Sequence, residues 1–387
     1  MDSTRFLFSN GIVHQVSDVP PVTSFLEAHP GVYTVTRTHN NASCLLLWER
    51  HLKRLANSLR IMFETNPKIL FGPNWSTAHS SLLSSTQLPQ FEPIIQCLVN
   101  ESISKVSPYI CKETKVGQEW SVAVLVCGNS EKFIEHASLD REKISRALDV
   151  HIHVSSHIPM VFGSSGASLA LVGRGRTLAT AKHLDWVRHR KTLEKLRAPS
   201  VTELLLSNDG DHILEGSVSN FFVVSRTDEK STEANEDTYS SFEVQTAPLG
   251  DVLPGIIRQL VIEVCLSMGI PVREVAPSWS MRESWEEAFI TSKLHGVECN
   301  SHHLTVLNSS ILNCPGLLLL VASDSLRILQ HVVSVRVPSS WDPSESRSWN
   351  EIEWEEKHLK DGPGMITMTI QAEVIRKASF EGYLLAS

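Results

Sequence analysis

The stretch HILEGSVSNFFVV, residues His212 to Val224, combines a strand-like apolar pattern with a single carboxylate. Its apolar and β-branched residues predict a β-strand. Glu215 interrupts this apolar pattern, next to a glycine. A carboxylate in such a strand is often exposed at a sheet edge, but a buried one is costly unless a cation meets it. The sequence therefore raises the question of which cation Glu215 would meet.

Three other elements carry residues that could take part in chemistry. Lys182 enters an apolar stretch, TAKHLDW, where burial would lower the pKa of the amine and make it a nucleophile. The segment LPGIIR, residues 253–258, marks a helix start, whose backbone amides bind phosphate well. Arg54, in ERHLKRL, can pair with an anion. Taken singly, each has an ordinary interpretation as a surface lysine, a helix terminus or a solvated helix face.

Taken together, the four elements match the needs of a pyridoxal phosphate site. A lysine holds the aldehyde of this cofactor as a Schiff base, and a carboxylate keeps its ring nitrogen protonated. A helix start and an arginine take the phosphate. Lys182 precedes Glu215 by 33 residues. The combination therefore predicts pyridoxal phosphate as the cofactor.

The order of the motifs resembles the class IV aminotransferase family, the fold type IV enzymes of pyridoxal phosphate. This family includes branched-chain aminotransferases, D-amino acid aminotransferases and aminodeoxychorismate lyase. The resemblance extends from about residue 6 to 375 and is most pronounced toward plant proteins described as D-amino acid aminotransferase-like. It rests on GVYTVTR (31–37), HLKRLANS (51–58), AKHLDW (181–186), LEGSVSNFFVV (214–224), TAPLGDVLPGIIR (246–258) and GPGMITMTI (362–370).

The resemblance implies a role for each matching residue. Lys182 would bind the cofactor and shuttle a proton, Glu215 would meet the pyridinium N–H, and Tyr33 would face cofactor and substrate. The phosphate would be bound by Arg54, by the amides of Gly255, Ile256 and Ile257, and by a second turn at Ser292 or Ser325.

Several positions depart from the family pattern. Ile257 stands where the family usually has a phosphate-binding threonine, and Asp185 stands where asparagine is common. Thr34 stands where branched-chain and D-amino acid enzymes often have glutamate, which makes the YTVTR segment more similar to that of the lyase. The stretch GRGR, residues 173–176, predicts a turn near the site entrance. These departures leave the substrate open.

The expected fold is α+β with two domains. Residues 1–158 would form a small α/β domain, and residues 159–387 a larger cofactor-binding domain with a β-barrel-like core. Asp209 and Gly210 predict the turn of a hairpin, and residues 226–243 are polar and acidic, which favours a disordered loop. Family members are usually homodimers, so the resemblance implies a homodimer here.

Composition narrows the partners and the location. The net charge of −8 argues against nucleic acid or an anionic membrane as a partner, and no apolar run reaches the ~20 residues of a membrane span. Seven scattered cysteines without a C-x-x-C pair favour reduced thiols and no zinc framework. We therefore expect a cytoplasmic protein without a metal site.

The leading interpretation is an aminotransferase that moves an amino group from an amino acid to a 2-oxo acid. A lyase with the same lysine, similar to aminodeoxychorismate lyase, is the closest alternative. A non-catalytic family member is a third, because of Ile257 and the disturbed second phosphate turn. A metal enzyme is a fourth, since His151, His153 and His157 have even spacing on one expected strand.

One segment does not fit the family pattern. After EEAFITS the family continues with a small polar turn and an apolar strand, whereas here Lys293 follows. The expected continuation comes later, at SLRILQHVVSVRV, residues 325–337. We therefore interpret residues 293–324 as an insertion foreign to the core, such as a retained intron, with a genuine family-specific loop as the alternative.

Overall fold

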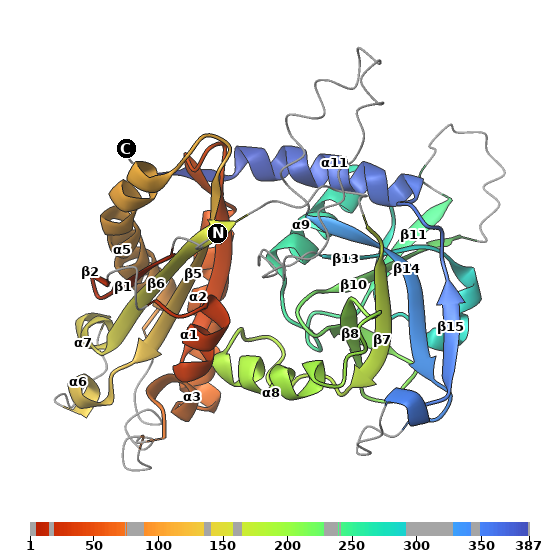
Figure 1. The fold of residues 1–387 in the computed structure, drawn as a ribbon, viewed down its shortest axis with the longest axis horizontal. Coiled ribbons are helices and arrows are strands. Elements are labelled where there is room, and N and C mark those ends of the chain that lie inside the picture. The colour runs from red at the N-terminus through yellow and green to blue at the C-terminus, as the bar shows by residue number, and fades with distance from the viewer. Residues whose placement is uncertain are drawn as a thin grey trace.

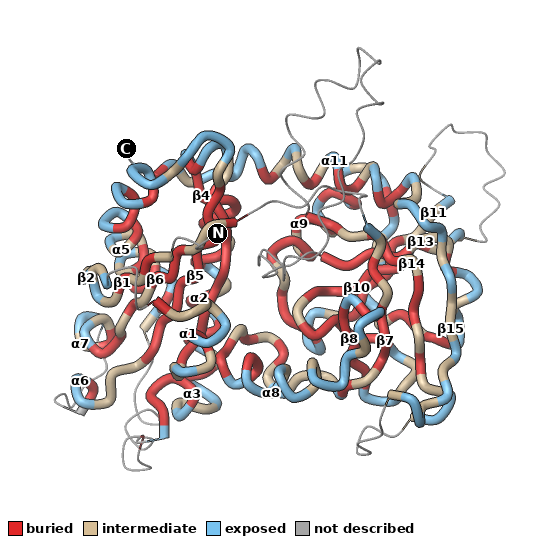
Figure 2. The backbone as a smooth tube through the Cα atoms, viewed as in Figure 1, coloured by how far each residue is buried: buried red, intermediate tan, exposed pale blue. Residues whose placement is uncertain are grey.

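The computed structural model describes residues 5–14, 19–73, 75, 89–134, 141–157, 165–227, 239, 241–291, 328–341 and 349–385. The described part of the chain forms two lobes, each built around one sheet (Figure 1). Buried residues run through the centre of both lobes, and exposed residues line their outer surface (Figure 2).

The first lobe contains a sheet in the order β16-β4-β3-β5-β6-β1-β2. Its central strands are apolar almost throughout, and helices cover both faces, as expected for strands that are buried on both sides. α2 and α5 cover one face, and α1 and α8 pack on the other. The strands are β1 Arg5–Ser9, β2 Ile12–His14, β3 Val32–His39, β4 Cys44–Leu46, β5 Glu119–Gly128, β6 Leu148–His157 and β16 Gly382–Leu384. The helices of this part are α1 Val22–Ala28, α2 Trp48–Thr65, α3 Lys68–Phe71, α5 Phe91–Glu113, α6 Ser130–Ile134 and α7 Arg141–Arg146.

The second lobe contains a sheet in the order β12-β11-β10-β13-β14-β7-β8-β9, with β15 paired to β14. An isolated bridge joins Glu215, in β9, to Asn220, which directly precedes β10. The end of the sheet thus returns to a strand within it, so the sheet curls into a half-barrel. Its strands are β7 Ala167–Gly173, β8 Glu203–Ser207, β9 Ile213–Gly216, β10 Phe221–Arg226, β11 Phe242–Thr246, β12 Val272–Glu274, β13 Trp285–Thr291, β14 Leu329–Pro338 and β15 Trp354–His358.

Helices of the second half of the chain connect and cover the lobes. α8 Leu184–Glu194 lies between the lobes, and α11 Met365–Phe380 runs over the second lobe toward the first (Figure 1). α9 Ile256–Ser267 packs against α11 and the sheet. Two 3₁₀ helices, η2 Trp279–Ser284 and η3 Trp349–Glu351, complete these elements. None of the described helices is long and apolar enough to cross a membrane.

Most elements expected from the sequence are present. The hairpin turns at Asp209 and Gly210 between β8 and β9, and Gly269, with φ +71°, directly follows the C-cap of α9. Pro254 directly precedes Gly255, the N-cap of α9, and so lies just outside the helix. The ends of the expected 226–243 loop belong to β10 and β11, and most of its middle lies outside the described residues.

The division into residues 1–158 and 159–387 stays a proposal, and the topology suggests one change to it. β16, near the C-terminus, pairs with β4 in the first sheet, Tyr383 opposite Leu45. The chain therefore returns to the first lobe after α11, so a division by sheets would assign residues 382–384 to the first lobe. Residues 158–164, at the boundary of this division, lie outside the described residues.

Candidate active site

The backbone of Lys182 is fixed between the two lobes. A turn at residues 177–180 precedes Lys182, and the next residue, His183, is extended and forms an isolated antiparallel bridge with Val32 of β3. The Lys182 carbonyl accepts a hydrogen bond from the Tyr33 amide at 3.1 Å. Its amide donates to Oγ of Ser58, in α2, at 3.0 Å. Both contacts come from the first lobe, so they hold the start of α8 against that lobe.

The surroundings of the Lys182 amine favour its neutral form. Its Nζ lies 4.6 Å from the centre of the Tyr33 ring. Burial is the main cause that lowers the pKa of this amine well below its usual value, and the charges of Arg54 and Arg176 lower it further. A neutral amine at pH 7 has a free lone pair, so Lys182 can act as a nucleophile and accept a proton at Nζ.

Arg54 reaches the same place from α2. His51, Arg54 and Ser58 lie on one face of the helix because they are spaced by three and four residues. Nη2 of Arg54 donates to Oγ1 of Thr34 at 2.9 Å, and the same hydroxyl lies 2.7 Å from Nδ1 of His51. Burial lowers the pKa of Arg54 to about 10, so the guanidinium stays charged at neutral pH. This network orients Arg54 toward the lysine.

Glu215 is buried at the seam of the half-barrel, where β9 meets the start of β10. Its side chain is 3% exposed, and Oε2 accepts a hydrogen bond from the Leu253 amide at 3.1 Å. Burial raises the pKa of this carboxyl to about 7, against the lowering effect of Arg176. Among the described residues, the cation nearest to Glu215 is therefore Arg176, with its Nε 3.7 Å from Oε1.

The side chain of Arg176 is buried, whereas the sequence predicts a turn at the site entrance for this stretch. Its side chain is only 4% exposed. The guanidinium lies over the ring of Trp186 at 5.0 Å, and Nη2 donates to the Ala181 carbonyl at 2.9 Å. Arg174, two residues earlier, is exposed. The GRGR stretch therefore sends one arginine inward and the other outward.

The start of α9 is drawn close to Glu215 by Asn220. Nδ2 of Asn220 donates to the Leu253 carbonyl at 3.0 Å. A Cβ atom on Gly255 would lie 2.0 Å from Oδ1 of Asn220, so only glycine fits at this position. The amide of Gly255 already donates to the Leu253 carbonyl at 2.7 Å. Of the three amides expected to bind phosphate, those of Ile256 and Ile257 remain, because the first amides of a helix have no partner within it.

The side chain of Ile257 belongs to the apolar core of the second lobe and is 6% exposed. It therefore adds packing at the position where the family has a hydroxyl. Asp185 is exposed and pairs with Arg188 at 2.6 Å, away from the buried cluster. Ser292 and Ser325, expected in the second phosphate turn, lie outside the described residues.

The three histidines considered as metal ligands have separate partners. His151 lies 2.9 Å from Oγ of Ser9, and Nε2 of His153 lies 2.9 Å from the Pro20 carbonyl. His157 contacts Arg37 at 3.1 Å, a cation that disfavours a metal ion at the same place. Within the described residues, no group of three or more His, Cys, Asp or Glu side chains is arranged to hold a metal ion.

The buried cluster of Lys182, Arg54, Arg176 and Glu215 fits the chemistry of pyridoxal phosphate. Two guanidinium groups face one carboxylate, so the cluster can accept a further negative charge such as a phosphate. Three of its buried polar atoms lack a hydrogen-bond partner: Nε of Arg54, Nε of Arg176 and Oε1 of Glu215. Buried polar atoms are normally paired, so these atoms mark a place for a polar ligand.

Sequence reasoning overlooked several residues of this cluster. The GRGR stretch predicts a turn near the site entrance and leaves open whether an arginine there meets a substrate carboxylate, and no pattern in the sequence indicates that Arg176 is buried beside Glu215. His51 and Ser58 stood within the quoted HLKRLANS motif, and their helical spacing with Arg54 was the signal that could have identified them. Trp186, whose indole N–H donates to the Ser217 carbonyl at 2.9 Å, also comes directly from a quoted motif.

The fold and this cluster define a mixed α+β protein in which a lysine amine of lowered pKa lies near a carboxylate. A sequence profile described as "Amino-transferase class IV" matches residues 31–298. The chain therefore belongs to the class IV aminotransferase family. No curated protein sequence matches it.

Solved structures share the fold. A branched-chain aminotransferase from Thermoproteus uzoniensis, with norvaline, is 15% identical, with 99% of this chain and 100% of that chain covered and a TM-score of 0.55. A mutant branched-chain amino acid aminotransferase from Thermobaculum terrenum is 13% identical, with 99% and 98% covered and a TM-score of 0.55. An aminotransferase from Brucella abortus bound to the co-factor PLP is 15% identical, with 97% and 99% covered and a TM-score of 0.52. The neighbours confirm the fold type IV architecture.

Proposed function

We propose that this protein is a pyridoxal-phosphate-dependent aminotransferase that moves an amino group from an amino acid to a 2-oxo acid. Family membership supports the general activity. The observation that carries the proposal is the place of the Lys182 amine, beside the Tyr33 ring and near Arg54, Arg176 and Glu215, where burial lowers its pKa. When bound, pyridoxal phosphate supplies an aldehyde and an electron-accepting ring.

Lys182 has two tasks in this proposal. Its Nζ would hold the cofactor at its aldehyde, which requires the uncharged amine that burial favours. The same Nζ would act as general base and acid, accepting a proton from the substrate Cα and donating it again. The hydrogen bonds from Tyr33 and to Ser58 fix the Lys182 backbone, so the amine stays within reach of both positions.

Arg54 and the start of α9 would bind the phosphate. Arg54 offers a charged guanidinium with an unpartnered Nε, oriented by Thr34. The amides of Ile256 and Ile257 add the positive end of a helix. The buried side chain of Ile257 leaves the threonine hydroxyl of the family without a replacement at this position.

Glu215 would accept the pyridine N–H. The carboxylate is anchored through Oε2 by the Leu253 amide, so Oε1 is left for a further partner. A cofactor ring that carries a proton at its nitrogen would supply the cation in the buried setting, and an ionised Glu215 would keep that proton in place. Tyr33, whose ring faces Nζ of Lys182, would pack along the cofactor.

The test is a spectroscopic titration of the purified protein. We expect a visible absorption band when pyridoxal phosphate is added, and conversion of this band by an amino acid donor. A 2-oxo acid added afterwards should restore the original band. A protein that retains the cofactor but responds to none of a panel of L- and D-amino acids would instead be a non-catalytic family member.

The same titration separates a transaminase from a lyase. A transaminase needs the 2-oxo acid to complete a turnover and gives one new amino acid for each donor consumed. A lyase releases its elimination product without any acceptor. A homodimeric state and a cytoplasmic location stay predictions, and the assembly can be measured by light scattering during size-exclusion chromatography.

A further inference from the structure

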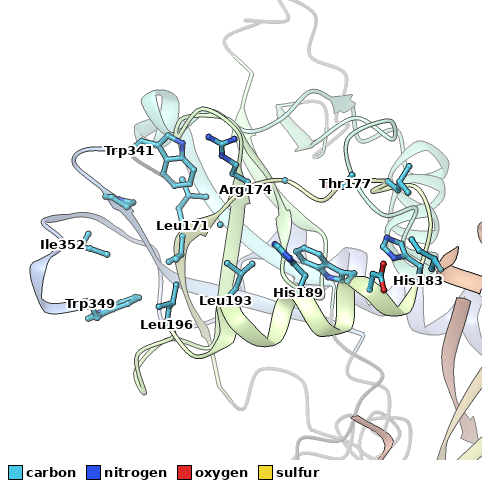
Figure 3. A pocket seen from close by; sticks show the side chains of 18 of the residues that line it. Leu171, Arg174, Thr177, His183, His189, Leu193, Leu196, Trp341, Trp349 and Ile352 are labelled. Carbon is cyan, nitrogen blue, oxygen red and sulfur yellow. The ribbon is translucent and has the colours of Figure 1, made fainter. Parts of the chain in front are cut away.

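A cavity with a volume of about 530 Å³ lies beside α8 (Figure 3). This volume is within the range of small-molecule sites, roughly 300–1,000 Å³. Its walls come from the end of β7, the following loop, α8, and the segments around Trp341 and Trp349. Lys182, Arg54, Arg176 and Glu215 are not among its lining residues. The cavity is therefore distinct from the candidate active site.

The two sites lie back to back across one short stretch of chain. Lys182 and His183 are consecutive residues just before α8, and their side chains have different surroundings. Lys182 points to Tyr33, whereas His183 lines the cavity. The ring of Trp186 also lines the cavity, and Arg176 packs on this ring from the active-site cluster.

The walls are suited to a flat apolar ring. Three tryptophans line the cavity, and two of them are fixed by other contacts. The indole N–H of Trp186 donates to the Ser217 carbonyl, and Trp349 stacks on Trp354 with a centroid distance of 4.4 Å. Leucine side chains add further apolar surface to the walls: Leu171, Leu193 and Leu196. Such rigid aromatic walls bind planar rings by stacking.

One end of the cavity carries unused hydrogen-bond donors. Arg174 and Trp341 lie at this end, and His183 lies at the other (Figure 3). Nε1 of Trp341 is buried and has no hydrogen-bond partner among the residues that the structure describes. Arg174 is exposed, and its guanidinium forms no ion pair within the described ranges of the chain. A cation and an N–H donor at one end favour an anionic acceptor there.

The far end is polar but uncharged. His183 is 6% exposed, and within the described residues its ring nitrogens form no full hydrogen bond, although the Thr177 backbone lies close to the ring. Burial, with the nearby charge of Arg176, lowers the pKa of His183 to about 4, so its ring is neutral at pH 7. The acidic group in the lining, Asp185, is paired with Arg188. The charge of Arg174 is therefore the uncompensated one in the described walls.

We propose that this cavity is a second ligand site that binds a planar aromatic carboxylate, with the ring between the tryptophans and the carboxylate on Arg174 and Trp341. His183 receives any polar substituent at the opposite end of the ligand. The site does not depend on the proposed transaminase activity, because none of its lining residues takes part in that chemistry.

The test uses 2-naphthoate, a planar aromatic carboxylate without an amino or oxo group that a transaminase could convert. Binding to the cofactor-loaded protein is measured by isothermal titration calorimetry, with 2-naphthamide as the uncharged counterpart. We expect 2-naphthoate to bind with one site per chain and to leave the visible spectrum of the bound cofactor unchanged. The amide should bind more weakly by about tenfold, the usual effect of one charge-assisted hydrogen bond.

Two variants locate the probe. Arg174→Gln and Trp341→Phe should each lower the affinity for 2-naphthoate by about tenfold, since each removes one hydrogen-bond donor to the carboxylate. Arg174→Gln should leave the affinity for 2-naphthamide unchanged. Arg146→Gln, which removes an exposed arginine on α7, is the matched control and should bind 2-naphthoate like the unmodified protein.

Three results would overturn the proposal. Equal affinity of Arg174→Gln and the unmodified protein for 2-naphthoate would show that the cation has no role. Loss of the cofactor band at the concentrations that give binding would place the probe in the cofactor site. Loss of 2-naphthoate binding at protein concentrations at which the chains associate would show that another copy of the protein, and not a small ligand, covers the cavity.

Discussion

Nε of Arg176 lies 3.7 Å from Oε1 of Glu215, and the two side chains are 4% and 3% exposed. The distance allows an ion pair but is longer than a hydrogen bond, so both atoms keep unused hydrogen-bonding capacity. In the protein alone, Arg176 is thus the cation that meets the carboxylate. Because this ion pair lacks a hydrogen bond, Oε1 of Glu215 can still accept one from another group.

This geometry predicts how the stability of the cofactor-free protein depends on pH. Burial raises the pKa of Glu215 to about 7, above the value of about 4.3 for an unfolded glutamate. Between these values the folded state binds more protons at Glu215 than the unfolded state, so stability from this residue falls as pH rises. We expect Glu215→Gln to remove this fall. The melting temperatures of both proteins, measured between pH 4.5 and 7.5, should diverge with pH, and parallel curves would contradict the prediction.

Glu215→Gln should also affect the loaded protein. We expect it to keep pyridoxal phosphate but to turn over slowly, because a neutral amide does not hold the ring nitrogen in its protonated form. Each lost unit of ring-nitrogen pKa corresponds to ~1.4 kcal/mol, or about tenfold. Steady-state rates and cofactor affinity are measured side by side. Unchanged rates in this variant would show that the carboxylate is structural.

Lys182→Ala should abolish the visible band of the lysine-bound cofactor. Lys191 is the matched control, because it is exposed and pairs with Glu27 at 2.7 Å. Its Ala variant should keep the band, since its charged amine lies on the surface. Absorption spectra after reconstitution and desalting distinguish the two. A band that survives in Lys182→Ala and is lost in Lys191→Ala would reverse the assignment.

Arg54→Ala should weaken cofactor retention. It removes a buried cation whose Nη2 is oriented by Thr34, and loss of such a phosphate contact weakens binding on the order of tenfold or more. Arg60→Ala is the control on the same helix, since Arg60 is exposed and bonds to Glu64. Equilibrium dialysis against pyridoxal phosphate gives both affinities, and equal values would reject a phosphate role for Arg54.

The sequence predicts many elements of this fold well, because their signals are local. The stripe of α2, the Asp209–Gly210 turn and Gly269 after α9 each depend on a few neighbouring residues. The placement of Arg176 beside Glu215 depends instead on how β7, α8 and β9 come together. No local periodicity encodes such a contact, so the buried arginine was taken for a turn residue.

The start of α9 also has details that the sequence alone does not predict. LPGIIR correctly predicted a helix N-terminus, but the amide of Gly255 is taken by Leu253 and the side chain of Ile257 enters the core. Asn220 contributes to this arrangement, because it pulls the loop before α9 against the seam of the half-barrel. A residue 35 positions away in the chain thus helps to decide which amides remain for phosphate.

The pairing of β13 with β14 bears on the segment interpreted as an insertion, residues 293–324, which lies outside the described residues. The two strands are antiparallel, with Thr291 opposite Leu329. Without residues 293–324, only Ser292 and residues 325–328 would connect these partners. Such a connection has the length of an ordinary hairpin loop, about 2–5 residues. Removing the segment therefore requires no change in the strand register.

We expect a chain that lacks residues 293–324 to fold, to be more soluble than the full chain and to bind pyridoxal phosphate more tightly. The deletion would bring Ser292 and Ser325 together at the end of β13, where the family resemblance places the second phosphate turn. It would also remove the apolar run PGLLLLVA, residues 315–322. Soluble yield and cofactor affinity, each compared with the full chain, check both effects. Replacing residues 293–324 by a Gly/Ser linker of equal length is the control, because it removes the apolar run but keeps the two serines apart in sequence. Aggregation or cofactor loss in the deletion, beside a yellow and active full chain, would show that the segment belongs to the fold.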